Sequence, residues 1–172
     1  TVEPLVSIHL PLYNEPNVAE RLLTACTSLD YKNYEVIVID DSTDETTDIL
    51  RKWAESNKVP VSLTDGGTSA QVQVIQTLLS LRIPVKIIHR TKRSGFKGGA
   101  LNEALKHMNP KAEYVIIFDA DFIPPPDIIR RFLAYFATSP PSTILNELLK
   151  LDKEYAEGKI SLDKYLEDRQ AL

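Results

Sequence analysis

The chain has 172 residues and a mass of 19.4 kDa, which is the size of one domain with a buried core. Hydrophobic residues make up 43% of it and charged residues 26%, a balance typical of folded proteins rather than disordered ones. The net charge of −4 argues against a nucleic-acid-binding protein, and the single cysteine excludes an internal disulfide and a cysteine-based zinc site. Because the longest apolar runs are too short to span a bilayer, we expect the chain itself to be soluble.

Apolar runs alternate with helical patterns along most of the chain. Pro11 marks the end of the first predicted strand, and Ser42 or Thr43 is the predicted N-cap of the second helix. The predicted elements, in chain order, are a strand at 5–10, a helix at 18–28, a strand at 34–40, a helix at 44–57, a strand at 59–63, a helix at 70–81, a strand at 85–89, a helix at 100–107, a strand at 114–118 and a helix at 127–137.

Short, uniformly apolar strands that alternate with helices predict a mostly parallel sheet covered by helices on both faces. We therefore expect a three-layer, Rossmann-like α/β domain over residues 1–138, with residues 60–84 as an insertion within it. After Ser139 the strand signals end. Two further helical patterns, at 146–157 and 162–172, predict a charged helical hairpin over residues 139–172, with a thin apolar stripe made of Leu148, Leu149, Leu151, Tyr155, Ile160, Tyr165 and Leu166.

Polar clusters follow four of the predicted strands. In an open parallel sheet the ligand lies beyond the carboxyl ends of the strands, so we expect these clusters to converge on one edge. The clusters are Pro11–Glu15, Asp40–Asp44, Arg90–Gly99 and Asp119–Asp121.

Asp119 and Asp121, with one residue between them, place two carboxylates within reach of a single hard cation. An isolated Asp-x-Asp is more often a solvated or capping turn, but its position directly after an apolar strand favours a metal site. A phosphatase of the haloacid dehalogenase type would have Thr or Val two residues after the second Asp. Ile123 stands there, which counts against that chemistry.

Arg90, Lys92, Arg93 and Lys97 place four positive charges beside glycines, a pattern suited to binding phosphate, although a solvated basic turn is the alternative. The spacing Gly-x-x-Gly-Gly differs from the dinucleotide fingerprint and from the nucleoside-triphosphate loop, which counts against NAD binding and ATP hydrolysis. Asp40 and Asp41 end a strand where nucleotide-binding folds present an acid to the ribose or the base. The segment Tyr13–Glu15 fits either a binding loop or a simple turn.

Together the four clusters resemble the donor-binding half of family 2 glycosyltransferases with a GT-A fold, and most closely the cellulose-synthase-like and glucomannan-synthase-like branch. The segments that carry the resemblance fall in family order: Ile8–Glu15, Val38–Asp44, Gly95–Leu105 and Ile117–Pro124.

The resemblance implies a metal-dependent, inverting hexosyltransferase that moves a sugar from a UDP- or GDP-linked donor to a glycan or lipid acceptor. It implies a longer, membrane-embedded parent protein that holds this domain on the cytoplasmic face of the membrane. It implies that Asp119 and Asp121 hold Mg²⁺ or Mn²⁺, with Asp121 favoured for direct contact. The donor-binding residues that it implies are Pro11, Tyr13, Glu15, Asp40, Asp41, Arg93, Lys97, Asn102 and Asp119.

The sequence departs from the family pattern in two places. The family's carboxylate general base, often in a Thr-Glu-Asp context, and the Gln-x-x-Arg-Trp motif of processive members do not occur, so no general base is assigned. Residues 60–84 are also more than the family usually has between its second and third motifs. Two alternatives therefore stay open: a nucleotide-sugar-binding module without transferase activity, and a nucleotidyltransferase, which would carry a basic, glycine-rich loop where Leu12–Glu15 stand.

Overall fold

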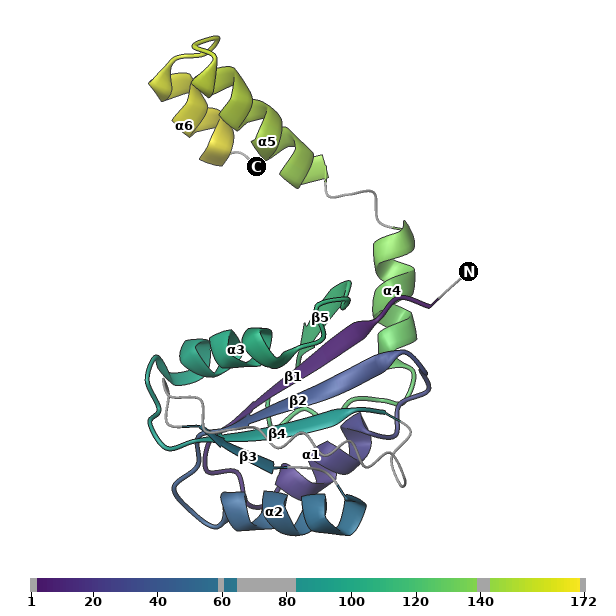
Figure 1. Cartoon of the computed structure of the whole chain (residues 1–172). Helices are drawn as coiled ribbons and strands as arrows, with labels where there is room; N and C mark the ends of the chain where they lie inside the picture. Colours follow the sequence, from purple (N-terminus) through teal and green to yellow (C-terminus); the bar gives the residue numbers. More distant parts are fainter. Residues whose placement is uncertain (1–2, 59–60, 65–82, 139–142, 171–172) are drawn as a thin grey trace. The chain divides into compact units, whose positions relative to one another are not determined.

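A parallel sheet forms the framework of the first 129 residues in the computed structural model, which describes residues 3–58, 61–64, 83–138 and 143–170 (Figure 1). Within this described part the strand order is β3-β4-β2-β1-β5, and every neighbouring pair is parallel. The strands are β1 (Val6–Leu12), β2 (Tyr34–Asp40), β3 (Val61–Thr64), β4 (Val85–Arg90) and β5 (Tyr114–Ile117).

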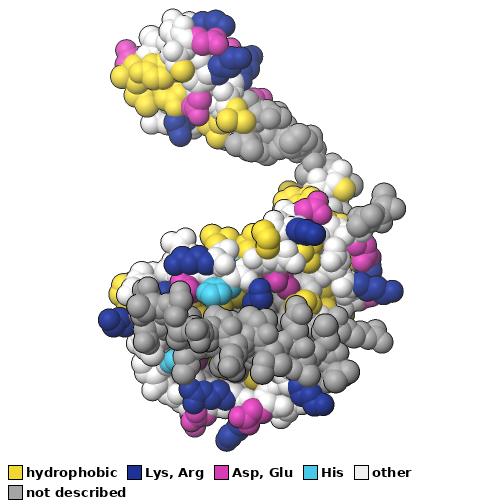
Figure 2. Space-filling view, viewed as in Figure 1, with side chains coloured by type: hydrophobic (Ala, Val, Ile, Leu, Met, Phe, Trp, Pro, Cys, Tyr) yellow, Lys and Arg dark blue, Asp and Glu magenta, His cyan; other side chains and the backbone are white. Residues whose placement is uncertain are grey.

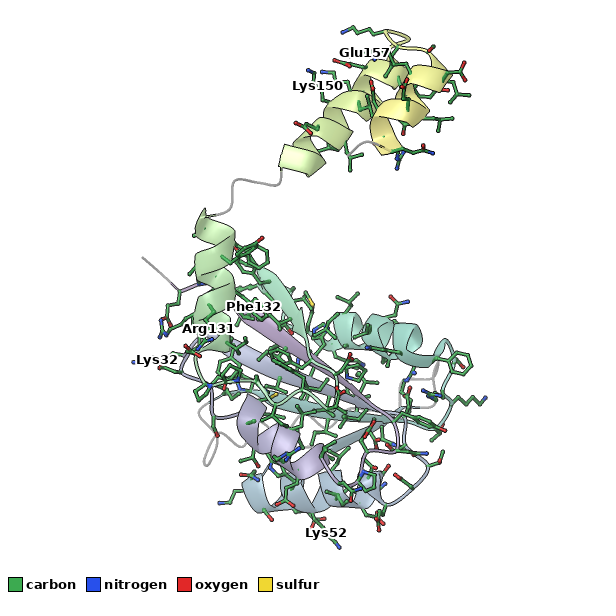
Figure 3. The ribbon with its side chains drawn as sticks, turned by 180° about the vertical axis from the view of Figure 1, so that it is seen from behind. Lys32, Lys52, Arg131, Phe132, Lys150 and Glu157 are labelled. Carbon is green, nitrogen blue, oxygen red and sulfur yellow. The ribbon has the colours of Figure 1, made fainter. Side chains whose placement is uncertain are left out.

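Helices cover the two faces of this sheet. Figure 1 shows α3 (Phe96–His107) on one face, and α1 (Ala19–Cys26) and α2 (Thr46–Asn57) on the other. The turned view of Figure 3 shows the side chains that fill the space between these layers. The predicted three-layer α/β fold is confirmed, because short buried strands leave both faces of the sheet apolar and in need of cover.

The core is centred on β1 and β2, which have a neighbouring strand on each side. Every residue of β2 is buried, and so is every residue of β1 except Pro11, which is half-buried. On the α3 face, Ile37 and Ile39 of β2 pack with Ala100 and Ala104 of α3. Small residues on the inner side of α3 therefore let the helix approach the sheet closely.

The strand β1 continues through Pro11 to Leu12, two residues beyond its predicted end. Pairing with β5 stops at His9, whereas pairing with β2 runs on to Leu12, whose carbonyl accepts a hydrogen bond from the Asp41 N–H at 2.9 Å. Successive residues of a strand direct their backbone hydrogen bonds to opposite sides, and His9 bonds on the β5 side. Pro11, two residues later, is on that same side, where β5 no longer pairs, so its missing N–H leaves no strand partner unsatisfied. Proline is therefore tolerated inside this strand.

The helix α2 starts at Thr46, and its N-cap is Glu45 rather than the predicted Ser42 or Thr43. The side chains of Ser42 and Thr43 are engaged elsewhere, in contacts with Asn14 of the loop that follows β1. The Asp44 carboxylate instead accepts a hydrogen bond from the Thr46 N–H at 2.9 Å, which satisfies one of the free donors of the helix start.

The strand β5 lies at one edge of the sheet, and its four residues are exposed or half-buried. Tyr114 is 36% exposed, Val115 40% and Ile117 48%. The expectation of a sheet covered on both faces thus holds for β1 and β2 and is wrong for β5, although the strand itself was predicted correctly from its apolar sequence.

The segment 60–84 is described only in part. Residues 61–64 form β3, which pairs with β4 at the other edge of the sheet, so the predicted strand at 59–63 is shifted towards Thr64. The predicted helix at 70–81 lies outside the described residues.

The second unit, Arg130–Leu172, contains most of α4 (Ile128–Thr138) and a hairpin of α5 (Thr143–Ala156) and α6 (Leu162–Gln170). The predicted hairpin is confirmed: the rings of Tyr155 and Tyr165 stack with centroids 4.7 Å apart, and Leu151 is buried. Figure 2 shows hydrophobic side chains grouped on the hairpin surface, where Leu149, Leu162 and Leu166 are about half exposed. The predicted boundary at Ser139 lies outside the described residues. Among the described helices, none combines the length and apolar character needed to cross a membrane.

Candidate functional site

A cavity of about 380 Å³ lies where the carboxyl ends of β1, β2 and β5 meet the start of α3. As predicted for a parallel sheet, residues from all four polar clusters line it, although more than one hundred positions separate the first from the last. The lining residues are Pro11, Leu12, Tyr13, Glu15, Asp41, Arg93, Lys97, Ala100, Asp119, Ala120 and Asp121.

Two of the predicted binding residues do not line this cavity. Asp40 is 1% exposed, and its carboxylate accepts hydrogen bonds from the Ser42 N–H at 3.0 Å and the Thr47 hydroxyl at 2.7 Å, with His89 Nδ1 at 2.8 Å. Asn102 is exposed on α3. Asp40 and Asp41 point to opposite faces because side chains alternate along an extended chain, and only Asp41 faces α3 and the cavity.

Asp41 is held by Arg90, the last residue of β4. The Arg90 Nε donates to Asp41 Oδ1 at 2.6 Å and Nη2 donates to Oδ2 at 2.5 Å, a bidentate pair in which both side chains are at most 5% exposed. Hydrogen bonding to Asp41 raises the pKa of Arg90 above its ordinary value. The expectation that Arg90 belongs to a phosphate-binding patch is therefore wrong, since its guanidinium is turned inwards to a carboxylate.

An aromatic and cationic stack forms another part of the wall. The Arg93 guanidinium lies 3.5 Å from the centroid of the Tyr13 ring and 5.2 Å from that of Phe96. Within the described residues, Arg93 Nε is a buried donor without a hydrogen-bond partner. Such a donor costs about 1–3 kcal/mol while it is unsatisfied, so an acceptor that a ligand brings to Arg93 would be favoured.

Lys97 and Asp119 both line the cavity and form a direct ion pair with each other. Asp121, two residues further on, lines the same space. No group of three or more His, Cys, Asp or Glu side chains in the described residues is arranged to hold a metal ion. Two carboxylates still suit Mg²⁺ or Mn²⁺, since such ions commonly take one or two carboxylates and complete their shell with phosphate oxygens and water.

The helix α3 begins at Phe96, four residues before its predicted start. The turn before it is tight: Gly95 has φ +72° and Phe96 φ +49°, a left-handed conformation that costs a bulky residue about 1–3 kcal/mol. A Cβ at Gly99 would lie 1.9 Å from the Ser94 carbonyl oxygen, so the turn packs directly on glycine backbone. This geometry turns Arg93 and Lys97 towards the cavity, whereas Lys92 is exposed and does not line it.

Asn14 has a structural role that was not predicted from the sequence. Its backbone is left-handed, with φ +54°, and its N–H donates to the Ser42 hydroxyl at 2.9 Å. Its side-chain oxygen accepts from the Thr43 N–H at 2.8 Å. Asn14 therefore ties the loop that carries Tyr13 and Glu15 to the loop that follows Asp41. The tolerance of asparagine for this backbone conformation was the available sequence signal.

The family model described as Glycosyl transferase family 2 matches residues 7–64 and 61–150 of this chain. The chain belongs to that family. All four segments that form the cavity lie within the matched residues.

Several plant proteins are similar in sequence. The chain is 30% identical over 145 residues to glucomannan 4-beta-mannosyltransferase 7 of Arabidopsis thaliana and 34% identical over 144 residues to the probable glucomannan 4-beta-mannosyltransferase 9 of Oryza sativa subsp. japonica. Each match covers 80% of this chain, but only 22% and 23% of the respective relative. The chain thus spans less than a quarter of the length of these relatives.

Two solved structures share the fold of this chain. The mannosyltransferase PcManGT from Pyrobaculum calidifontis, in complex with GDP-Man and Mn²⁺, superimposes with a TM-score of 0.60 and 29% identity, covering 83% of this chain and 34% of that one. S. aureus TarS 1–349 in complex with UDP-GlcNAc gives a TM-score of 0.54 at 23% identity, covering 78% of this chain and 31% of TarS, and shows the fold alone.

Proposed function

We propose that this chain is the donor-binding part of a metal-dependent, inverting glycosyltransferase that moves a hexose from a UDP- or GDP-linked donor to a glycan or lipid acceptor. The observation that carries the proposal is the cavity in which acidic residues from the ends of β2 and β5 face basic residues from the start of α3. The family assignment supports it, and so does the similarity to PcManGT, a mannosyltransferase solved with GDP-Man and Mn²⁺.

The nucleoside would lie at the end of the cavity formed by Pro11, Tyr13, Glu15 and Asp41. The Tyr13 ring is 41% exposed and offers a surface for a base, and Asp41 is a hydrogen-bond acceptor held in place by Arg90. A carboxylate with a fixed orientation accepts N–H or O–H donors of a base or ribose selectively. We assign no donor-binding role to Asp40 or Asn102, because neither residue lines the cavity.

The diphosphate would lie between Arg93, Lys97 and the aspartates that follow β5. Lys97 is 54% exposed and pairs with Asp119, so its ammonium is accessible to phosphate oxygens. Asp119 and Asp121 would hold Mg²⁺ or Mn²⁺, which neutralises negative charge on the leaving nucleoside diphosphate. Arg93 and Lys97 would bind and orient the diphosphate from the opposite side, and the start of α3 adds backbone N–H donors there.

The acceptor side of the reaction requires a group that takes the proton of the attacking hydroxyl. The cavity carboxylates are already assigned to the nucleoside and the cation, and the sequence has no family motif for a general base. We infer that polypeptide corresponding to the remainder of the longer relatives supplies it, and that this larger protein is membrane-embedded with the present domain on the cytoplasmic face. We further propose that residues 1–138 form the donor-binding domain and 139–172 an appendage.

The alternative is a module that binds nucleotide sugar without transferring it. The same cavity supports that function, because nothing in donor binding needs the general base. A coupled assay that detects release of UDP from UDP-glucose or GDP from GDP-mannose separates the two: metal-dependent release by the purified chain rules out the binding-only alternative.

The direct test of the proposal is metal-dependent nucleotide binding. We expect the chain to bind UDP or GDP in the presence of Mn²⁺ and to lose that binding when EDTA is added or when Asp121 is changed to Asn. Asp48→Asn, an exposed aspartate on α2 outside the cavity, is the matched control. Calorimetry measures the nucleotide affinity of the wild type with Mn²⁺ and with EDTA, and of both variants with Mn²⁺. An unchanged affinity of Asp121→Asn in Mn²⁺ would show that this residue does not hold the metal.

A further inference from the structure

Arg90 makes four hydrogen bonds that join two separate parts of the cavity wall. Two go to the Asp41 carboxylate, at 2.6 and 2.5 Å. The other two go to backbone carbonyls of the turn before α3: Nη1 donates to Ser94 O and Nη2 to Phe96 O, both at 3.2 Å. Four of the five N–H groups of the guanidinium are therefore used inside the protein.

The partners of Arg90 belong to two segments that lie far apart in the sequence and meet at this guanidinium. Asp41 follows β2, and the Ser94–Phe96 turn lies between the cavity residues Arg93 and Lys97. Arg90 itself is 5% exposed and is not among the residues that line the cavity. It is thus placed to fix the wall without touching what the cavity contains.

The turn needs such a support. Gly95 and Phe96 both have left-handed backbones, and a non-glycine residue keeps that conformation only where its surroundings impose it. The Ser94 carbonyl is held on one side by Arg90 and on the other by the close approach of Gly99. Without the guanidinium, the Phe96 carbonyl loses the side-chain donor that holds it.

We propose that Arg90 is a positioning residue that sets the Asp41 carboxylate and the Ser94–Phe96 turn relative to each other. Both ends of an elongated ligand, a nucleoside at Asp41 and a diphosphate at Lys97, are then bound by one prearranged wall. The identity of this ligand rests on the proposed function, whereas the mechanical link from Asp41 through Arg90 to the turn does not. Lysine cannot replace arginine here, since a single ammonium cannot form the planar fork and reach both carbonyls.

The first test needs no ligand. Trypsin cleavage after Arg93 and Lys97, followed by mass spectrometry, reports how often the turn opens, and cleavage after Lys52 on α2 (Figure 3) reports opening elsewhere. We expect Arg90→Lys and Asp41→Asn each to raise cleavage in the turn by about tenfold relative to Lys52. Arg51→Lys, an exposed arginine on α2, is the control and should change neither rate.

Loss of one member of a buried ion pair can unfold a protein, which would raise cleavage at every site. The double variant Asp41→Asn/Arg90→Gln avoids this, because it removes both charges of the pair together with the bidentate hydrogen bonds. It should fold and still show faster cleavage in the turn. A folded Asp41→Asn or double variant with a wild-type rate after Arg93 and Lys97 overturns the proposal.

The second test uses uridine, guanosine and pyrophosphate separately, each with Mn²⁺. A positioning role predicts that Arg90→Lys weakens both the nucleoside and pyrophosphate by about fivefold or more, while Lys97→Ala weakens pyrophosphate alone. If Arg90→Lys weakens only pyrophosphate, Arg90 is a phosphate contact and the proposal is wrong. If the wild-type chain binds none of the three, the proposed function fails, and the trypsin experiment still decides the role of Arg90.

Discussion

Lys97 illustrates how one side chain serves both the free protein and the proposed complex. It faces Asp119, and the two side chains are 54% and 60% exposed. Exposed ion pairs contribute only about 0–1 kcal/mol to stability, so little is lost when this pair separates. A diphosphate that takes over the ammonium would leave the Asp119 oxygens free for a cation.

We therefore expect Lys97→Ala to weaken nucleoside diphosphates much more than nucleosides. A charge-assisted hydrogen bond contributes about 1.5–3 kcal/mol, which corresponds to a loss of about 10- to 150-fold in affinity for UDP or GDP. Calorimetric titration with UDP and with uridine measures both effects. Lys106→Ala, on the same helix but paired with Glu103 outside the cavity, is the control. An equal loss for uridine and UDP would place Lys97 away from the phosphates.

The sequence predicts which residues lie near the site, but it does not predict which way their side chains point. The sequence indicates that Asp40 and Asp41 end a strand, and the fold sends one to α2 and the other to the cavity. Likewise, the sequence predicts Arg90 to be one of four basic residues in a phosphate-binding loop. In the structure its side chain instead donates hydrogen bonds to Asp41, which lies 49 positions earlier. Such pairings depend on which strands are neighbours, and the strand order is a property of the whole sheet.

The start of α3 is the element on which the site depends most. Gly98 and Gly99 occupy its first turn, and they differ in their surroundings: a Cβ at Gly98 has nothing within 4 Å, whereas one at Gly99 meets Ser94 O at 1.9 Å and Arg90 Nη1 at 3.0 Å. Only the second glycine is required by close packing, and its neighbours are the turn and the arginine that shape the cavity.

Alanine substitution should separate these two glycines. Gly99→Ala forces the turn away from α3 and should destabilise the chain by about 1–3 kcal/mol, the usual cost of overpacking. Gly98→Ala removes backbone freedom at an open helical position and should leave stability unchanged or raise it by up to about 1 kcal/mol. Urea unfolding of both variants measures the difference. Similar midpoints for the two would contradict the close approach at Gly99.

Strands were easier to predict than helix starts. Each described strand is a short segment rich in apolar and β-branched residues, and the predicted ranges agree with the structure to within two residues. The starts of α2 and α3 were wrong because Ser42 and Thr43 bind Asn14 instead of capping, and because a left-handed turn allows α3 to begin at Phe96. At these two helix starts, tertiary contacts therefore override the local sequence signals for capping.

At the scale of the whole molecule, two buried ionisable groups make stability sensitive to alkali. Burial raises the pKa of the Cys26 thiol to about 12 and that of the Tyr34 hydroxyl to about 12, from ordinary values of 9.0 and 10.0. The unfolded chain therefore releases these protons first as the pH rises. Their contribution to stability is complete below about pH 9 and is lost progressively between pH 9 and 12.

The thiol can be isolated by substitution. Between pH 9 and 10 the wild-type free energy of unfolding should fall by up to about 1.4 kcal/mol per pH unit because of the thiol and by less because of the Tyr34 hydroxyl, and Cys26→Ala should remove the share due to the thiol. Urea unfolding at pH 8, 9.5 and 10.5 measures the two slopes. Parallel slopes for wild type and variant would mean that the native thiol ionises as readily as the unfolded one.

Tyr13 and Asp121, both in the cavity wall, are brought together only when β1, β2 and β5 have assembled. A peptide that lacks any one of these strands has no cavity for a nucleotide, so nucleotide binding and folding are thermodynamically linked. Any compound that occupies the space adds to the free energy of unfolding, by about 2.7 kcal/mol at one hundred times its dissociation constant. A rise in melting temperature is accordingly a sufficient screen for candidate donors, even before a sugar acceptor is known.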